Sequence, residues 1–170
     1  MVIHQEGKTN VVHYAYCLDE DLQDEGIKVS AFVGHSMGAA ALGVYSKMSK
    51  LPSSIVLIAS PTRIDGVFSR FAKMLKLSKR SAGVLCQIAE ERTGHKMSEV
   101  SLSSLQLPYK TKVLAFHDED DETIPFSDFE ILKKLNLNIE LVVTKGLGHS
   151  RIKNDASVMK KIVEHLGQDF

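Results

Sequence analysis

The sequence contains few of the residues that mark specialised classes of protein. Its 170 residues include two cysteines, Cys17 and Cys86, and no tryptophan. Two cysteines allow one disulfide at most, which excludes a disulfide-stabilised secreted scaffold and favours free thiols in a reducing compartment. The first residues also lack the charged and apolar regions of a secretory signal. We therefore expect a cytoplasmic protein.

Neither an excess of charge nor a long apolar run is present. The 21 lysines and arginines equal the 21 aspartates and glutamates, so the net charge is zero. A protein without a global positive field is not expected to hold nucleic acid. No apolar run is long enough to span a bilayer. We expect neither a nucleic-acid partner nor a membrane partner, and the length fits a single domain over residues 1–170.

Short apolar segments alternate with segments of helical periodicity along the chain. This alternation predicts an α/β fold, in which helices flank a parallel sheet. The predicted strands cover residues 29–33, 54–60, 111–117 and 139–144. The predicted helices cover residues 37–48 and 127–135, with a first helix from Asn10 to a stop at Gly26 and a last helix from Asn154 to a stop at Gly167.

One segment interrupts the alternation. Residues 62–105 contain no convincing strand, although Phe68, Phe71 and Leu75 fall on one helical face and Gly94 is suited to end a second helix. We interpret this segment as a helical cap inserted between the second and third strands.

A serine lies between two glycines at the end of the first predicted strand, in the sequence FVGHSMGAAALGVYS. Such a tight turn from strand to helix exposes a serine nucleophile and crowds the backbone on either side of it. We therefore expect that Gly34 and Gly38 are glycines because a side chain would not fit at either position. The amide of Met37, at the start of the helix, is placed to bind an oxyanion next to Ser36.

A serine nucleophile needs a base and an acid that orients the base. The predicted strands that end near residues 117 and 144 are followed by HDEDDETIP and KGLGHSRI. Because the carboxyl ends of parallel strands meet at one edge of the sheet, both segments can approach Ser36. His149 follows two glycines in a loop that we expect to be flexible, and it is the candidate base. We assign little catalytic weight to His35, and His117 is expected to be a packed or hydrogen-bonded histidine.

The sequence from Gly34 to Gly38, the acidic segment and the GLGH segment together resemble the α/β-hydrolase superfamily, in its esterase and lipase-like branch with a helical cap. The resemblance covers nearly the whole chain, and its motifs occur in the superfamily's order. It implies a serine hydrolase that cleaves an ester or thioester, with Ser36 as nucleophile, His149 as base and Asp121 as acid. Asp118 stands where the superfamily usually has glycine, so Asp118 and Asp120 stay open as alternatives to Asp121.

The alternating acids of the 118–122 segment could also belong to a calcium loop. That reading fails because Thr123 stands at the sixth position, where glycine is needed, and Phe129 at the twelfth, where a bidentate glutamate is needed. We expect no metal and no organic cofactor.

The resemblance also implies that the strands which usually precede the nucleophile strand are missing. One consequence is a free sheet edge, for which we expect a homodimer to provide cover. The other is an oxyanion hole with one certain donor, the Met37 amide, and hence weak activity. The alternative to an enzyme is therefore a catalytically weak remnant of the fold that serves as a binding or subunit module.

Overall fold

The computed structural model describes residues 10–102, 111–135 and 138–167. Its four strands form one parallel sheet in the order β1-β2-β3-β4. The strands are β1 (Ala31–His35), β2 (Ser54–Ile58), β3 (Lys112–Asp118) and β4 (Ile139–Thr144). The predicted parallel sheet is confirmed. The first strand, however, begins two residues later than predicted and extends to His35, where it still pairs with Ile58.

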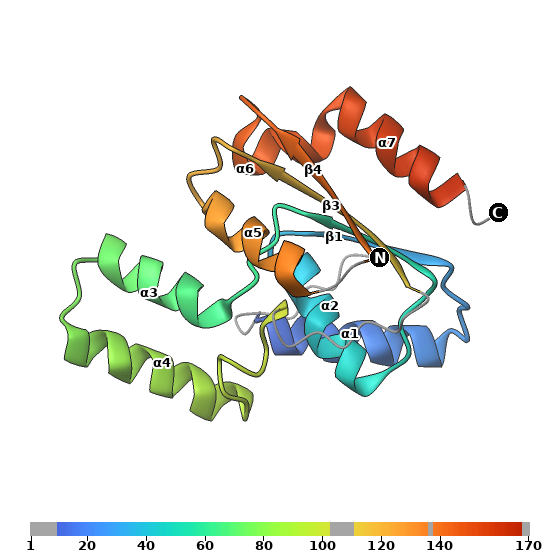
Figure 1. Cartoon of the computed structure of the whole chain (residues 1–170). Helices are drawn as coiled ribbons and strands as arrows, with labels where there is room; N and C mark the ends of the chain where they lie inside the picture. The colour runs from blue at the N-terminus through green and yellow to red at the C-terminus, as the bar shows by residue number, and fades with distance from the viewer. Residues whose placement is uncertain (1–9, 103–110, 136–137, 168–170) are drawn as a thin grey trace.

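Helices occupy the connections between the strands (Figure 1). The α2 boundaries agree with the prediction, and the Asn10 side chain caps α1 by accepting from the His13 amide. The last helix is capped differently from the prediction, because Asp155, not Asn154, accepts from the Ser157 and Val158 amides. The helices are α1 (Val11–Asp24), α2 (Met37–Met48), α3 (Ile64–Met74), α4 (Lys79–Thr93), α5 (Phe126–Leu135), α6 (Gly148–Arg151) and α7 (Ala156–Gly167), with the 3₁₀ turn η2 (Ile152–Asn154).

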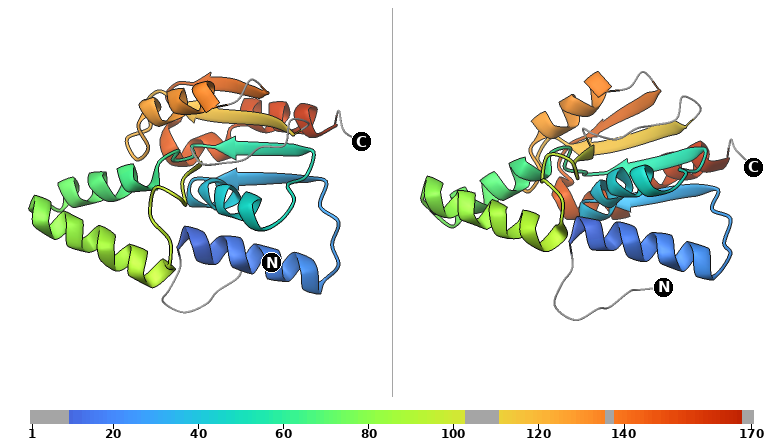
Figure 2. Two further views of the ribbon diagram at one scale, coloured as in Figure 1. Left: turned by 60° about the horizontal axis from the view of Figure 1, so that its bottom comes forward. Right: turned by 90° about the horizontal axis from the view of Figure 1, so that it is seen from below.

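The two faces of the sheet carry separate apolar cores. On one face, α1, α2 and α5 pack against side chains such as Phe32, Ile55 and Leu57. On the other face, α7 packs against the alternate side chains of β2 and β3 through Val158 and Ile162. Figure 2 shows α1 and α2 lying beside β1, with α7 on the opposite side of the sheet. This arrangement leaves the carboxyl ends of all four strands at one edge.

Helices α3 and α4 form a hairpin that projects from the rest of the molecule (Figure 1). Gly94 ends α4 with a φ of 69°, as its position in the sequence predicts. The predicted apolar face is only partly covered: Phe68 packs against the core, whereas Phe71 is 45% and Leu75 is 51% exposed. The described part of the expected cap ends at Leu102, and residues 103–105 lie outside the described residues. The hairpin is held at its base, where the Ile64 amide donates to the Ser101 hydroxyl.

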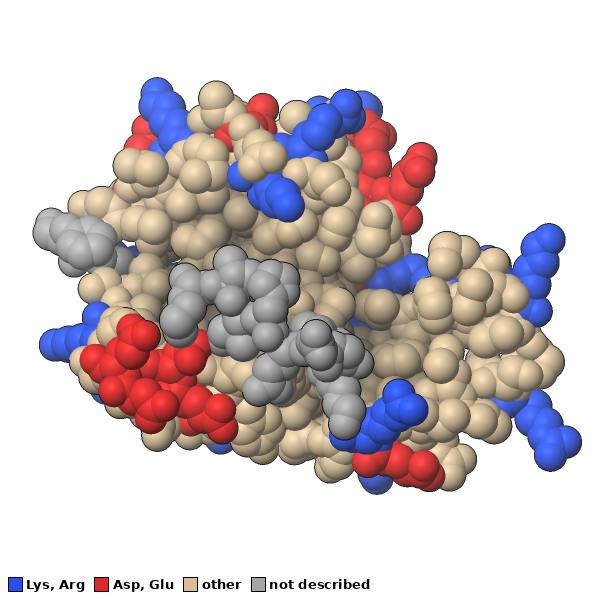
Figure 3. Space-filling view, turned by 180° about the vertical axis from the view of Figure 1, so that it is seen from behind, with Lys and Arg blue, Asp and Glu red and all other residues tan. Residues whose placement is uncertain are grey.

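Strand β1 is an outer strand of the described sheet, and Val33 in its middle is 52% exposed. The homodimer expected to cover this edge stays a prediction. Among the described residues, none of the helices has the length and apolar character needed to cross a membrane. The zero net charge conceals an uneven distribution, because acidic side chains gather over the C-terminal end of α1 (Figure 3). They belong to Asp19, Glu20, Asp21, Asp24 and Glu25.

The turn from β1 to α2 is the tightest packing point near Ser36. A Cβ atom added to Gly34 would lie 2.6 Å from the Ala39 Cα atom and 2.8 Å from its amide nitrogen, both backbone atoms that cannot rotate away. The prediction that a side chain would not fit is therefore confirmed at Gly34. It is wrong at Gly38, where an added Cβ would meet no atom within 4 Å. Gly38 borders open space, so crowding does not explain its presence.

We predict that Gly34→Ala and Gly38→Ala differ sharply in stability. The added methyl at Gly34 must displace α2 from β1, which should cost about 1–3 kcal/mol in the free energy of unfolding. At Gly38 the methyl fits into open space, and alanine favours the helix by up to about 1 kcal/mol. Urea denaturation of both variants measures the difference. Equal destabilisation of the two variants would contradict the assignment of the close contact to Gly34.

Candidate functional site

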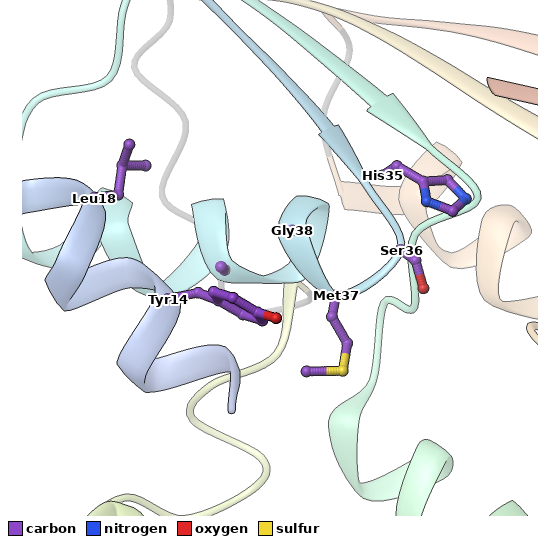
Figure 4. Close-up of a pocket in the computed structure, with 7 residues that line it drawn as sticks. Tyr14, Leu18, His35, Ser36, Met37 and Gly38 are labelled. Atoms are coloured by element: carbon purple, nitrogen blue, oxygen red, sulfur yellow. The ribbon is translucent and has the colours of Figure 1, made fainter. Parts of the chain in front are cut away.

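Ser36 occupies a strained backbone conformation between β1 and α2. Its φ of 53° and ψ of −120° lie outside the regions that residues other than glycine usually adopt. The Ser36 amide donates to the Ile58 carbonyl at 2.9 Å, so the residue is held to the end of the sheet. The turn places the side chain at the carboxyl edge of the strands, and Figure 4 shows its hydroxyl directed away from the β1 ribbon.

His149 lies between Ser36 and Asp121. Its Nδ1 atom is 2.8 Å from Asp121 Oδ2, and its Nε2 atom is 2.9 Å from Ser36 Oγ. A carboxylate accepts hydrogen bonds, so Nδ1 carries the proton and Nε2 presents its lone pair to the serine hydroxyl. This tautomer allows the imidazole to take a proton from Ser36. The structure thus brings together the three residues that the sequence selected.

Asp121 is fixed by the turn in which it lies. Its Oδ1 atom accepts from the amides of Thr123 and Ile124, both at 2.8 Å, which leaves Oδ2 for His149. The side chain is fully buried. Two rigid amide donors therefore set the direction of the carboxylate, and the carboxylate in turn sets the direction of the imidazole ring.

The two other acids considered from the sequence hold the loop that carries His149. Asp118 Oδ2 accepts from the Thr144 hydroxyl at 2.7 Å and the Leu147 amide at 3.0 Å, and Asp120 Oδ2 accepts from the Gly146 amide. Burial raises the pKa of Asp118. The hydrogen bonds that Asp118 accepts, including those from Thr144 and Leu147, outweigh burial and hold its pKa below the ordinary value. The loop expected to be flexible is thus tied to the end of β3, and His149 lies in the first turn of α6.

The Met37 amide lies next to the nucleophile, in the first residue of α2. The first amides of a helix have no acceptor within the helix, and together they favour negative charge at that end. These amides are therefore suited to bind an oxygen atom that becomes negative when Ser36 attacks. The Met37 side chain itself is 40% exposed, so ligand can approach from this side.

Comparison with solved structures identifies the fold. No protein-family model matches the sequence, and no curated protein is similar to it in sequence. A thermophilic esterase superposes with a TM-score of 0.60 at 19% identity over 96% of this chain and 78% of its own. Alpha/beta hydrolase domain-containing protein 10 from mouse gives a TM-score of 0.67 at 13% identity over 95% of this chain and 69% of its own. The chain has the α/β-hydrolase fold.

A third neighbour with this fold is MGS-MChE2, an α/β hydrolase enzyme from the metagenome of sediments from the lagoon of Mar Chica, Morocco. It gives a TM-score of 0.63 at 18% identity, over 96% of this chain and 73% of its own. All three neighbours are longer than the part that matches. The expected α/β-hydrolase fold is therefore confirmed, and the chain spans only part of the length of these neighbours.

His35 has a role in this α/β-hydrolase structure that sequence reasoning missed. Its Nε2 atom is 2.9 Å from the His149 carbonyl oxygen, and the two imidazole rings are 5.0 Å apart. Burial lowers the pKa of His35 and outweighs the hydrogen bond to the His149 backbone, which raises it, so the net pKa lies below its ordinary value and the neutral ring is favoured. Nε2 then carries the ring's single proton and donates it to the carbonyl. His35, which directly precedes the nucleophile, is thereby bonded to the backbone of His149.

The sequence feature that could have indicated this role of His35 is its position. A residue next to the nucleophile and on an outer strand lies beside whichever loop approaches Ser36, but the sequence alone does not identify that loop. His117 agrees with its prediction as a packed, hydrogen-bonded histidine. It is fully buried, and its Nε2 atom lies 2.9 Å from the Ile124 carbonyl. It therefore stabilises the turn that positions Asp121.

We predict that His35 positions His149 through its N–H group. His35→Gln keeps a donor that can reach the same carbonyl, whereas His35→Phe keeps a ring and removes the donor. In proton NMR spectra, the His149 Nδ1 proton should exchange with water at least several-fold faster in the phenylalanine variant and near the wild-type rate in the glutamine variant. Identical exchange rates in all three proteins would rule out a positioning role.

Proposed function

We propose that the protein is a serine hydrolase that cleaves an ester or thioester. The observation that carries the proposal is the continuous hydrogen-bonded chain from Ser36 Oγ through His149 to Asp121, at 2.9 and 2.8 Å. This is the arrangement in which a serine hydroxyl becomes a nucleophile, because a neighbouring imidazole takes its proton. Solved structures described as an esterase and as an α/β hydrolase enzyme share the fold and agree with this chemistry.

Acylation begins when Ser36 Oγ attacks the acyl carbon and its proton moves to His149 Nε2. The carbonyl oxygen becomes negative, and the Met37 amide donates a hydrogen bond to it. His149 then gives the proton to the departing alcohol or thiol as the bond between it and the acyl carbon breaks. Asp121 keeps the imidazole in place and stabilises its charged form during both transfers.

Deacylation repeats these steps with water. His149 takes a proton from a water molecule, whose oxygen attacks the acyl carbon attached to Ser36. The bond between the acyl carbon and Ser36 Oγ breaks, the proton returns to Ser36, and the carboxylic acid leaves. The sum is one ester or thioester and one water converted to an acid and an alcohol or thiol.

We predict that the protein hydrolyses a p-nitrophenyl ester, because His149 Nε2 is placed to take the Ser36 proton. Asp121→Asn should lower kcat by roughly 10⁴-fold, because an amide in place of the carboxylate favours the wrong imidazole tautomer. His149→Ala should lower kcat at least as much as Asp121→Asn, because no base is left to take the Ser36 proton.

The matched control is Asp120→Asn, which changes a neighbouring acid that contacts the Gly146 amide and not the imidazole. Its kcat should stay within about tenfold of wild type. A wild-type rate in His149→Ala, or a larger loss in Asp120→Asn than in Asp121→Asn, would contradict the assigned roles. No hydrolysis of esters or thioesters by the wild-type protein would favour the alternative, a binding or subunit module.

A further inference from the structure

The reaction proposed above makes a negative oxygen next to the Met37 amide, and efficient acyl transfer usually provides that oxygen with more than one donor. The sequence identified a single donor. A second donor into the same space would have to come from the residues around Ser36.

A cavity of about 440 Å³ opens beside Ser36, between α1 and the start of α2 (Figure 4). Its volume is within the range of small-molecule sites. Two of its lining residues, Tyr14 and Leu18, come from α1. The others come from the nucleophile turn and α2: His35, Ser36, Met37, Gly38 and Ala41. The cavity thus contains both the nucleophile and the residue whose amide faces the developing charge.

Three side chains in this cavity can form hydrogen bonds. Ser36 and His35 are already occupied, since they pair with the His149 ring and the His149 carbonyl. The third is Tyr14, whose hydroxyl has no partner among the described residues. Figure 4 shows the Tyr14 ring directed from α1 toward the start of α2, with its hydroxyl at the end nearer Met37. Tyr14 is therefore the cavity's available side-chain donor.

The position of Tyr14 is set by well-packed neighbours. Asn10 caps α1 one turn before it, and the Tyr14 amide donates to the Asn10 carbonyl at 3.0 Å. The adjacent Ala15 is fully buried in the core shared with α2. The acidic side chains of α1 begin at Asp19, more than a helical turn further along, so they do not flank the Tyr14 hydroxyl.

Gly38 provides a further observation in favour of an occupied cavity. It lines the same cavity as Tyr14, and among the described residues no atom beyond its own stretch of helix lies within 4 Å of the place where its Cβ would be. The absence of a side chain at Gly38 keeps this space open for a ligand.

We propose that the Tyr14 hydroxyl donates the second hydrogen bond to the oxyanion, opposite the Met37 amide. This inference rests on the proposed hydrolase function. The tyrosine takes no proton and forms no covalent bond in the reaction: its O–H group approaches the substrate oxygen as that oxygen becomes negative. The helix before β1 thus supplies a donor that the sequence motifs did not identify.

The test is Tyr14→Phe, which removes one oxygen atom and keeps the ring. Hydrolysis of a p-nitrophenyl ester should show kcat lowered by about 100-fold with little change in KM, because the lost hydrogen bond forms mainly in the transition state. The matched control is Tyr16→Phe, on the same helix and 44% exposed, which should stay within about twofold of wild type.

A boronic acid provides a second measurement. Methylboronic acid forms a bond from boron to Ser36 Oγ, the serine proton moves to His149, and the product is a tetrahedral anion that resembles the transition state. Inhibition by this probe should weaken at least tenfold in Tyr14→Phe and remain unchanged in Tyr16→Phe. Thermal unfolding of each variant should match wild type, since Tyr14 is 38% exposed and its hydroxyl has no described partner to lose.

The outcomes separate this inference from the function on which it rests. If Ser36→Ala abolishes hydrolysis while Tyr14→Phe keeps kcat and boronate inhibition within twofold of wild type, Tyr14 is not the second donor. A rise in KM with unchanged kcat in Tyr14→Phe would also overturn the inference, because it would assign the hydroxyl to substrate binding alone. If Ser36→Ala retains the wild-type rate, the proposed function itself fails.

Discussion

The site depends on the close approach of β1 and α2 at Gly34. Because Gly34 has no side chain, the Ala39 backbone can lie against it, and the chain can reverse within a few residues. That reversal forces Ser36 into its strained conformation and directs its hydroxyl out from the sheet edge. It also begins α2 immediately after the serine, so the Met37 amide is beside the nucleophile. One backbone contact therefore places both the attacking group and a donor for the charge that it creates.

The site also requires that His149 be held rigidly next to Ser36, and the acidic segment after β3 holds it there. Neighbouring acids have separate tasks: Asp118 and Asp120 hold the backbone of the histidine loop, and Asp121 holds the imidazole. His35 adds a contact from β1 to the same loop. The imidazole is therefore fixed by contacts from two strand ends. This division of tasks explains why the turn after β3 carries several carboxylates.

Sequence reasoning succeeded where local chemistry determines structure. Strand patterns predicted the parallel sheet, Asn10 caps the start of α1, and Gly94 ends α4 as expected. The position after β4 suggested His149, and the resemblance to α/β hydrolases suggested Asp121, which the structure places beside His149. It failed where a contact with a residue distant in the sequence determines the local structure. Pairing with Ile58 sets the end of β1, and crowding affects Gly34 but not Gly38 because only Gly34 faces Ala39. Likewise, nothing near Tyr14 in the sequence indicates that it lines a cavity with Ser36.

The central claim is that His149 and Asp121 make Ser36 a nucleophile. The most direct measurement is intact-mass analysis after treatment with a fluorophosphonate, which forms a phosphorus–oxygen bond to an activated serine and releases fluoride. The wild-type protein should gain one probe per chain, Ser36→Ala should gain none, and Ser30→Ala, changed just before β1, should label like wild type. An unlabelled wild-type protein, or equal labelling of Ser36→Ala, would contradict the account.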